Sequence, residues 1–473
     1  MSGTRSGTRW HIRGGAATRA TTTMADQCVA SASNFAVGIV VARIAGPAGL
    51  GAFALAYTVW ILLTTIHRSL ITDPMAIMGD IRGNHKDKFI RCGFAADVTL
   101  GFMAACVIAA VGSALLVVGQ HTFGIGMLAV APWVIVLDLQ DYWRWIGFME
   151  GNPRKSLMND LLFNAVQALA FGAIFLAGLH SVFAVVSAWG MGAGVAALYG
   201  LRQFSVRPTI RGGAAFLLSR WPTSRWLASE RAASWGASQF YLIVAGVMLG
   251  PAALGGLKAA QGLVVGPTVV VVNAGGSFGL PEATRKLADH GWTGMVRVSR
   301  FVTGAAVTAA LACGIVVLLA APTLLRILYG PEFVPYAPCA RLFAISIVVS
   351  AFAVGPIITL TATRRVRPLF MVQLGRLAVA LAAVSVLSSL YGVTGAAAAD
   401  VLAAVVTTVA IVVLQSWTRH SVEGSQRHFA LEAVRRRLVR NAAYLLMLSP
   451  QPSTWPSPNK TREQKRSQVL QRR

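Results

Sequence analysis

The feature that most constrains this chain is a series of apolar stretches, each about twenty residues long and almost free of charge. A helix of that length crosses roughly 30 Å of hydrocarbon. Because lipid offers no hydrogen-bond partners, continuous Ala, Val, Leu and Gly stretches satisfy their backbone only as helix, whereas a barrel would need short alternating strands. With 55% hydrophobic and 12% charged residues, the sequence predicts an all-α integral membrane protein. The twelve predicted transmembrane helices are about 27–45, 52–73, 93–118, 125–145, 157–178, 182–200, 232–249, 258–280, 301–321, 341–361, 369–390 and 396–417.

The basic residues indicate how these helices are oriented. Of the 42 Lys and Arg residues, 36 lie in tails and loops on one side of the predicted membrane, and the loops on the other side hold Arg326 alone. By the positive-inside rule the basic side is the cytoplasm, so both termini are expected there. The net charge of +25 is then explained by topology and by anionic membrane lipids as partners, and nucleic acid is not expected as a partner.

A hairpin is repeated at half-chain spacing. The stretch "SASNFAVGIVVARIAGPAGLGAFALAY" (31–57) aligns with "GASQFYLIVAGVMLGPAALGGLKAAQG" (236–262) at an offset of 204 to 205 residues. An even number of predicted helices separates the two copies, so the repeats run parallel. Two parallel six-helix repeats around a central cavity are typical of transporters. The alternative interpretation is that Gly-Pro turns and small residues only allow tight hairpins to pack.

The predicted organisation follows from these spans. It comprises a basic cytoplasmic N-terminal tail (1–26), a first six-helix lobe (27–200), an Arg-rich cytoplasmic linker (201–231), a second six-helix lobe (232–417), an amphipathic cytoplasmic interfacial helix (418–449) and a disordered basic tail (450–473).

Two segments carry a family resemblance. The first hairpin, followed by "LITDPMAIMG", and the segment "DLQDYWRWIGFMEGNPRKSLMNDLLFNAVQ" resemble the polysaccharide-flippase branch, which includes O-antigen exporters, of the multidrug/oligosaccharidyl-lipid/polysaccharide exporter superfamily. The resemblance is good over about 27–170 and fainter over 232–300. The matching positions are Ser33, Asn34, Phe35, Ala42, Arg43, Gly46, Pro47, Leu50 and Gly51 in the first segment, and Tyr142, Arg144, Gly151, Asn152, Pro153, Arg154 and Gln167 in the second.

The resemblance implies a flippase that moves a lipid-linked oligosaccharide or polysaccharide precursor of the cell envelope across the bacterial plasma membrane by alternating access. A lipid-linked glycan is then the substrate, and a glycan polymerase or glycosyltransferase is a candidate partner. The alternative is a cation-coupled antiporter of drugs or other small molecules. Helix one, however, lacks the buried acid of multidrug members, and peptidoglycan-precursor flippases have fourteen helices where this chain has twelve.

Ionisable residues at membrane depth are costly and commonly face a cavity, so each is a functional candidate. The cationic candidates for gripping an anionic head group are Arg376, Arg43, Arg68 and Lys258. Arg43 and Arg68 lie near helix ends, so the alternative to a place in the cavity is that their side chains extend to the membrane–water interface. The side chain of Lys258 could in the same way lie at the outer membrane–water interface. Arg376 lies deeper in its helix, so its side chain reaches the interface less easily.

Neutral polar residues in the repeated hairpins form a second group. Ser31 and Asn34 share a face of helix one, and Ser238 and Tyr241 are placed similarly on helix seven. They would offer hydrogen bonds to sugar hydroxyls if they face the cavity. If they face each other instead, they join helices by polar contacts.

Four charged residues are candidates for coupling or gating. Asp138 and Asp141 share a face of helix four, with Arg144 one turn beyond Asp141. These residues suit a proton or cation site, or a salt bridge that closes a cytoplasmic gate. Asp400, near the outer end of helix twelve, is the fourth candidate. Asp97 and Asp160 are interpreted as capping or interfacial groups.

An enzymatic function is not expected. The longest predicted outer segment, about 322–340, is too small for a catalytic domain. The sequence has no phosphate-binding loop and no His pattern typical of metal ligands, so neither a metal nor another cofactor is expected.

Overall fold

The computed structural model describes residues 7–78, 86–179, 181–206, 209, 211–274, 279–363 and 365–447. All regular secondary structure in these residues is helical, as the sequence predicts. The helices are α1 (Gly7–Leu70), α2 (Thr72–Met78), α3 (Lys86–Val117), α4 (His121–Val130), η2 (Ala131–Trp133), α5 (Val134–Met149), α6 (Pro153–Leu176), α7 (Val182–Gln203), α8 (Gly213–Leu249), α9 (Pro251–Ala274), α10 (Leu280–Leu328), η4 (Pro331–Tyr336), α11 (Ala337–Ala351), α12 (Val354–Ala362) and α13 (Val366–Met447).

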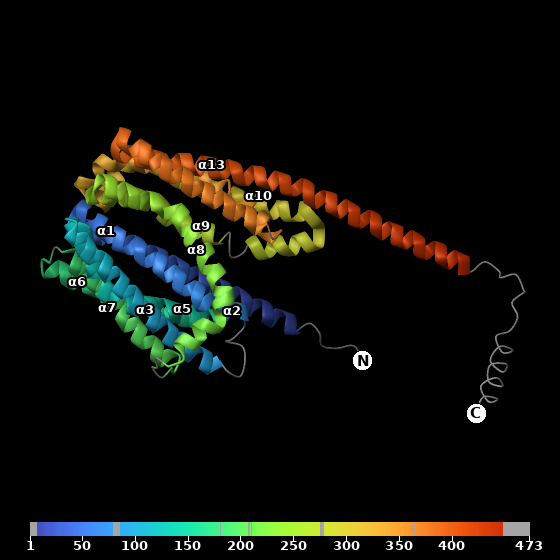
Figure 1. The fold of residues 1–473 in the computed structure, drawn as a ribbon, viewed down its shortest axis with the longest axis horizontal. Coiled ribbons are helices and arrows are strands. Elements are labelled where there is room, and N and C mark those ends of the chain that lie inside the picture. Colours follow the sequence, from blue (N-terminus) through green and yellow to red (C-terminus); the bar gives the residue numbers. More distant parts are fainter. Residues whose placement is uncertain are drawn as a thin grey trace, which may run out of the picture. The chain divides into compact units, whose positions relative to one another are not determined.

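The described helices account for the twelve predicted spans. Nine described segments are long and apolar enough to cross a membrane. Two of them, Cys28–Met78 and Arg367–Thr418, each contain two spans, because the chain turns back at Gly46 and at Gly392, whose torsions are not helical (Figure 1). These eleven spans and the 24-residue helix α9 give twelve in the part of the chain that the structure describes. The chain is therefore a multi-pass membrane protein.

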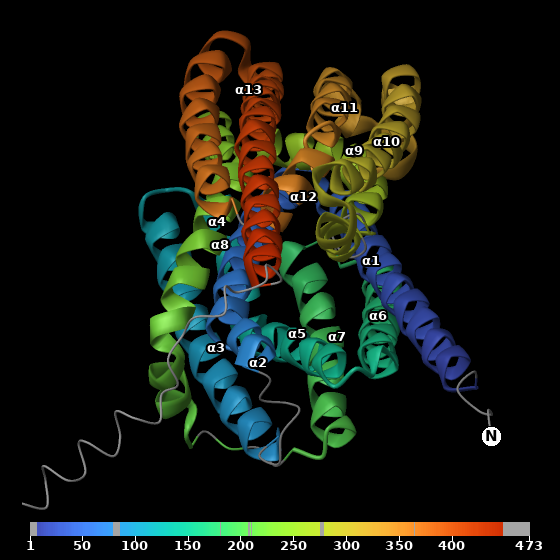
Figure 2. The same cartoon turned by 90° about the vertical axis from the view of Figure 1, so that its right-hand side faces the viewer.

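The two halves of the chain form two groups of helices up to Ser416, where the first compact unit ends. The helices α1 to α7, coloured blue to green, gather on one side, and α9 to α13, coloured yellow-green to orange, gather on the other (Figures 1 and 2). The helix α8 packs on α3 as well as on α9, so it passes from one group to the other. One apolar core joins both groups, with buried residues such as Val41, Val134 and Leu257.

The predicted tails and linker differ in how far the structure describes them. The chain is already helical from Gly7, and α8 begins at Gly213, so much of the predicted tail 1–26 and linker 201–231 is helix. The boundaries of the lobes stay predictions. From Trp417 onward the chain forms a second unit, in which α13 continues to Met447. Side chains beyond residue 418 and the whole predicted tail 450–473 lie outside the described residues.

The two repeated Gly-Pro turns pack against each other. Pro47 and Pro251 follow Gly46 and Gly250, whose φ angles of +65° and +91° suit glycine. Downstream in α1, Gly51 lies so close to the carbonyl of Pro251 that a Cβ atom on it would overlap that group. Reciprocally, a Cβ atom on Gly255 of α9 would overlap the carbonyl of Pro47.

This contact decides between the two interpretations of the hairpin. The glycines do allow close packing, as small residues do between membrane helices. The packing, however, joins the two halves of the chain, and it is made by repeat-related residues 204 positions apart. Two parallel repeats therefore meet face to face at their turns.

We expect Gly51→Ala and Gly255→Ala each to destabilise this contact, because an added methyl group has no space there. Overpacking of this kind costs about 1–3 kcal/mol. Thermal unfolding of the purified protein in lipid nanodiscs measures the effect as a lower midpoint temperature. The control is Gly304→Ala, where a Cβ atom meets nothing within 4 Å. An equal response of all three variants would contradict the assigned contact.

Candidate functional site

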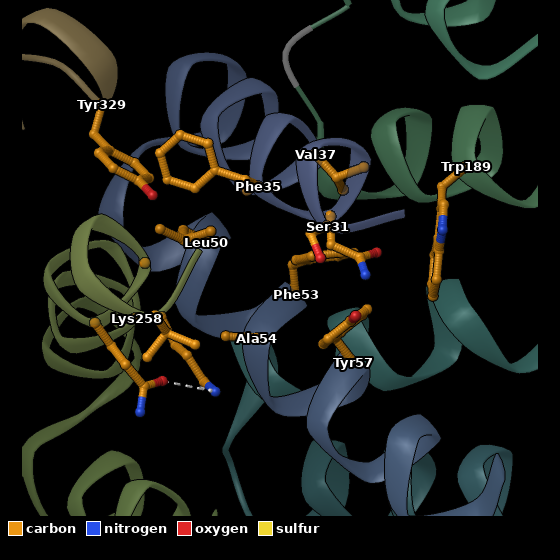
Figure 3. A pocket seen from close by; sticks show the side chains of 15 residues that line it. Ser31, Phe35, Val37, Leu50, Phe53, Ala54, Tyr57, Trp189, Lys258 and Tyr329 are labelled. Carbon is orange, nitrogen blue, oxygen red and sulfur yellow. Dashed lines mark hydrogen bonds between the residues drawn. The ribbon is translucent and has the colours of Figure 1, made fainter. Parts of the chain in front are cut away.

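A cavity of ≈ 300 Å³ lies between the two halves of the chain. Both arms of the α1 hairpin and helix α7 line it from the first half, and α9 and the turn after α10 line it from the second. In Figure 3, Lys258 of α9 approaches the cavity from the side opposite Tyr57 and Trp189. Of the residues predicted for the cavity, Ser31, Asn34 and Lys258 line it.

Lys258 is the one positively charged side chain among the described residues that line the cavity. Its Nζ donates hydrogen bonds to the amide oxygens of Gln239 (3.2 Å) and Gln261 (3.4 Å), which are both neutral. The amide nitrogen of Gln261 in turn donates to the hydroxyl of Tyr241 (3.1 Å). An ammonium group that lines a cavity and has only neutral acceptors among the described residues provides a favourable site for an anion.

Residues at repeat-related positions give the two sides of the cavity different chemistry. Ala54 and Tyr57 of α1 correspond, at the offset of 204, to Lys258 and Gln261 of α9. All four line the cavity. The first half therefore contributes an apolar and aromatic surface where the second half contributes a cation and an amide.

The aromatic side of the cavity is a packed cluster. Phe53 and Tyr57 of α1 lie 5.8 and 5.7 Å from Trp189 of α7, measured between ring centroids. Trp60 lies behind them, 5.0 Å from Trp189 and 5.5 Å from Tyr57. The indole nitrogen of Trp60 donates a hydrogen bond to Oδ1 of Asp138 (3.1 Å). The cavity wall is thereby connected to a buried carboxylate of α5.

Asp138 is part of a buried polar cluster behind this wall. Oδ1 of Asp138 also accepts from the hydroxyl of Thr64 (2.6 Å), and Oδ2 lies 2.9 Å from Nδ1 of His67. Asp97 of α3 is close enough to interact electrostatically with His67 and Asp138. The interpretation of Asp97 as a capping or interfacial group is wrong, because its side chain is buried among helices and only 4% of the residue surface is exposed.

The charged residues of helix α5 pair with other helices. Arg68 of α1 binds the carboxylate of Asp141 through two nitrogen atoms. Arg144 binds Asp26 of α1 (2.6 Å) and Asp160 of α6 (3.1 Å). A salt bridge is one of the two interpretations of these residues. Among the described contacts Asp141 and Arg144 do not pair with each other, since the side chains of both reach partners on neighbouring helices. Asp160, also expected at an interface, is buried.

Arg43 does not line the cavity. Its guanidinium group crosses to the second half of the chain and donates to the backbone carbonyls of Arg326, Ile327 and Leu328 at the end of α10. Carbonyls in the last turn of a helix lack intrahelical donors and carry partial negative charge, so a cation is favoured there. Arg43 thus holds the first half of the chain to a helix end of the second.

Arg376 and Asp400, the remaining charged candidates, face each other in α13. Their closest nitrogen and oxygen atoms are 3.7 Å apart, and the hydroxyl of Ser346 donates to Asp400 (2.6 Å). Arg376 is not among the cavity-lining residues. Tyr241 is buried behind Gln261, and Ser238 donates to a carbonyl of its own helix.

A further charged cluster lies outside the membrane-spanning segments, where α3, α5 and α6 meet. Glu150 follows α5 and binds Lys86 (2.6 Å) and Lys155 (2.9 Å). Burial by itself would raise the pKa of Glu150, but the hydrogen bonds from the two lysines outweigh it and lower that pKa. The carboxylate consequently stays ionised and fixes the ends of three helices.

Several residues that matter here were not among the candidates from the sequence. Gln261 could have been found, because it lies one helical turn from Lys258 on the same face. His67 could also have been found, because it is an ionisable residue next to Arg68 in a predicted membrane helix. No pattern along the chain indicated Trp60, since its role depends on an α5 residue 78 positions away.

Comparisons with known proteins identify the fold. The chain matches no protein-family profile and no curated protein sequence. Among solved structures, it is similar to the inward-facing conformation of a multidrug resistance MATE family transporter of the MOP superfamily. That likeness has a TM-score of 0.69 at 13% identity and covers 84% of this chain and 95% of the transporter.

A second likeness is to the lipid II flippase MurJ in its inward closed conformation. It has a TM-score of 0.61 at 11% identity and covers 83% of this chain and 86% of MurJ. An outward-facing MATE transporter is also similar, with a TM-score of 0.57 at 14% identity, covering 86% of this chain and 95% of that one. The chain therefore has the fold of MOP-superfamily transporters, and these neighbours are transporters and a flippase rather than enzymes.

We expect Arg144→Ala to be strongly destabilising, because it leaves the carboxylates of Asp26 and Asp160 buried without their guanidinium partner. Removing one partner of a buried ion pair costs about 3–5 kcal/mol. Adding Asp160→Asn should restore part of the loss, since it removes one stranded charge. Thermal unfolding checks both, with Arg154→Ala on the exposed start of α6 as control. Equal effects of Arg144→Ala and Arg154→Ala would refute the assigned pairing.

Proposed function

We propose that this protein flips a lipid-linked oligosaccharide or polysaccharide precursor across the bacterial plasma membrane by alternating access. Both termini would lie in the cytoplasm, and a glycan polymerase or glycosyltransferase would supply or consume the glycan. The observation that carries the proposal is Lys258, a cation in the wall of the cavity whose hydrogen-bond acceptors are neutral amides. Such a group favours a substrate with an anionic head, as the phosphates of lipid-linked glycans are.

The two-sided chemistry of the cavity supports the same substrate class. Lys258 and Gln261 offer a charge and hydrogen bonds for phosphate and sugar, with Ser31 and Asn34 as further polar groups. The opposite aromatic wall, which includes Trp189, suits the apolar parts of an amphiphile. Ligand sites commonly combine an apolar lining with a few polar groups that fix orientation.

In this proposal Arg376, Arg68 and Arg43 act outside the cavity. Each already has carboxylate or carbonyl partners in the described structure. Arg43 would hold the two halves together in this conformation and release α10 when they rearrange. Arg376 with Asp400, and Arg68 with Asp141, would stabilise the interior of each half.

A cation-coupled antiporter of small molecules is the second candidate. The aromatic wall formed by Phe53, Tyr57 and Trp189 favours it, because aromatic surfaces also bind drug-like amphiphiles. Lys258 argues against cationic drugs as substrates, since an ammonium group that has no carboxylate partner among the described residues would repel them.

The test is to deplete the protein in its host and to measure lipid-linked intermediates and surface glycans together by mass spectrometry. Accumulation of one oligosaccharyl lipid with loss of its surface polymer is the expected result. Unchanged lipid-linked pools with increased sensitivity to small amphiphiles would favour the antiporter and exclude the flippase.

We expect Lys258→Gln to reduce transport strongly and Lys258→Arg to retain much of it. A hydrogen bond to a charged group contributes about 1.5–3 kcal/mol, so loss of the cation should weaken substrate binding on the order of 10- to 100-fold. Recovery of surface glycan in depleted cells measures the effect. The control is Lys88→Gln, which changes an exposed lysine of α3. Full recovery by Lys258→Gln would remove Lys258 from the substrate site.

A further inference from the structure

The polar cluster behind the aromatic wall contains more acid than base. Five side chains form it: His67 and Arg68 of α1, Asp97 of α3, and Asp138 and Asp141 of α5. If His67 is neutral, three carboxylates face one guanidinium group, which leaves two negative charges. Isolated charges are expensive to bury, and a site with this imbalance binds a positive ion or is protonated.

The individual contacts show where the excess charge lies. Asp141 is matched by Arg68, and Oδ1 of Asp138 accepts hydrogen bonds from Trp60 and Thr64. Oδ2 of Asp97 is buried, and among the described residues it has no hydrogen-bond partner. Asp97 and the His67–Asp138 contact are therefore the part of the cluster that lacks its counter-charge.

Other ionisable groups surround this place without supplying that charge. Tyr142 of α5 and Cys92 of α3 are neutral in their ordinary state, and Tyr142 donates its hydroxyl hydrogen to a backbone carbonyl of α3 (2.7 Å). Asp73 of α2 adds a further carboxylate, and Arg231 of α8 lies 3.7 Å from it. Among the described residues, the charged groups that act on Asp97 are His67, Asp138 and Asp141, so the excess charge at this place stays negative.

From this geometry we infer that His67, Asp138 and Asp97 form a proton-binding site in the first half of the chain, and that its protonation is transmitted to the cavity through Trp60. The inference rests on the proposed transport function and names the ion that would drive it. An imidazole accepts a proton near neutral pH. Carboxylates do so when they are buried close to one another, because each negative charge disfavours the other.

The transmission step follows from contacts already described. Trp60 donates its indole hydrogen to Asp138 and packs on Tyr57 and Trp189, which both line the cavity. A proton on Asp138 turns an acceptor that carries full charge into a weaker neutral one. The Trp60 side chain, and the aromatic wall that rests on it, are then held less firmly.

Proton uptake by the purified protein in nanodiscs tests the site directly. We expect Asp97→Asn to take up about one proton fewer than wild type between about pH 8 and pH 5, within the range where His and perturbed carboxyl groups titrate. The matched control is Asp87→Asn, which changes an exposed acid of the same helix. Uptake by Asp97→Asn equal to that of the control would overturn the proposal.

Folding of the variant is a separate readout. Because Oδ2 of Asp97 has no described partner, Asp97→Asn and the apolar Asp97→Leu should be as stable as wild type or more so. If Asp97→Asn does not fold, Asp97→Leu takes its place in the titration. Titration in the presence of sodium identifies the ion: if sodium displaces the protons at this site, the assignment to protons is wrong.

Transmission is tested by Trp60→Phe, which keeps the ring and removes the hydrogen bond to Asp138. Because the lost hydrogen bond favours the charged form of Asp138, Trp60→Phe should still take up protons, starting at a higher pH than wild type. Its surface-glycan output should no longer fall when a protonophore collapses the proton gradient. Trp221→Phe, at a 52% exposed position of α8, is the control. A wild-type response of Trp60→Phe would disprove the proposed route.

The two proposals fail in different ways. Proton uptake that is lost in Asp97→Asn, together with unchanged lipid-linked pools on depletion, would refute the flippase function and leave the proton site standing. Accumulation of a lipid-linked glycan on depletion, with normal uptake by Asp97→Asn, would refute the proton site and leave the function standing.

Discussion

The structure depends on the close contact between the two Gly-Pro turns. Glycine at positions 51 and 255 allows the α1 and α9 backbones to approach as closely as they do, because a Cβ atom at either position would overlap the carbonyl of the proline in the other repeat. Because these turns belong to repeat-related hairpins, the contact places equivalent faces of both halves around one space. The cavity lies along these same two hairpins, so the packing that joins the halves also positions the candidate site.

The fold was largely predictable from the sequence, because lipid leaves the backbone few options. The number of spans followed from apolar length, and the two-fold arrangement followed from one repeated turn. The cavity was predictable only in part. Ser31 and Asn34 were found as polar residues of the repeated hairpin, and Lys258 was found as a rare ionisable residue in a predicted membrane helix. The pairing of charges was not predictable, because Arg144 selects Asp26 and Asp160 on other helices over a neighbour in its own.

The fates of the intramembrane arginines share one physical reason. A guanidinium group in a low-dielectric interior needs several acceptors, and carboxylates or helix-end carbonyls provide them. Arg43 finds three carbonyls, Arg68 a carboxylate, and Arg376 a carboxylate at longer range. Arg376 was distinguished by its depth along a helix. Depth indicates how much free energy a charge in the membrane costs, but it does not show which group neutralises that charge. Lys258 differs because its neighbours are amides. Gln261 lies one turn away on the same helix, whereas Gln239 of α8 is brought beside Lys258 only when the helices are assembled.

The two halves share the backbone geometry of the repeated hairpin, but the charged residues at and behind the cavity are of opposite sign in the two halves. The second half presents a cation to the cavity, and the first half keeps a surplus of carboxylates behind an aromatic wall. A purely symmetric cavity would hold an amphiphile equally well in two orientations, whereas this one has a polar side and an aromatic side and therefore selects one. Protons would neutralise the carboxylates of the first half, and an anion would neutralise Lys258 of the second. The charges of both halves are then neutralised only when both ligands are bound. Coupling between the two would then arise from charge neutralisation in each half, with Trp60 as the physical connection.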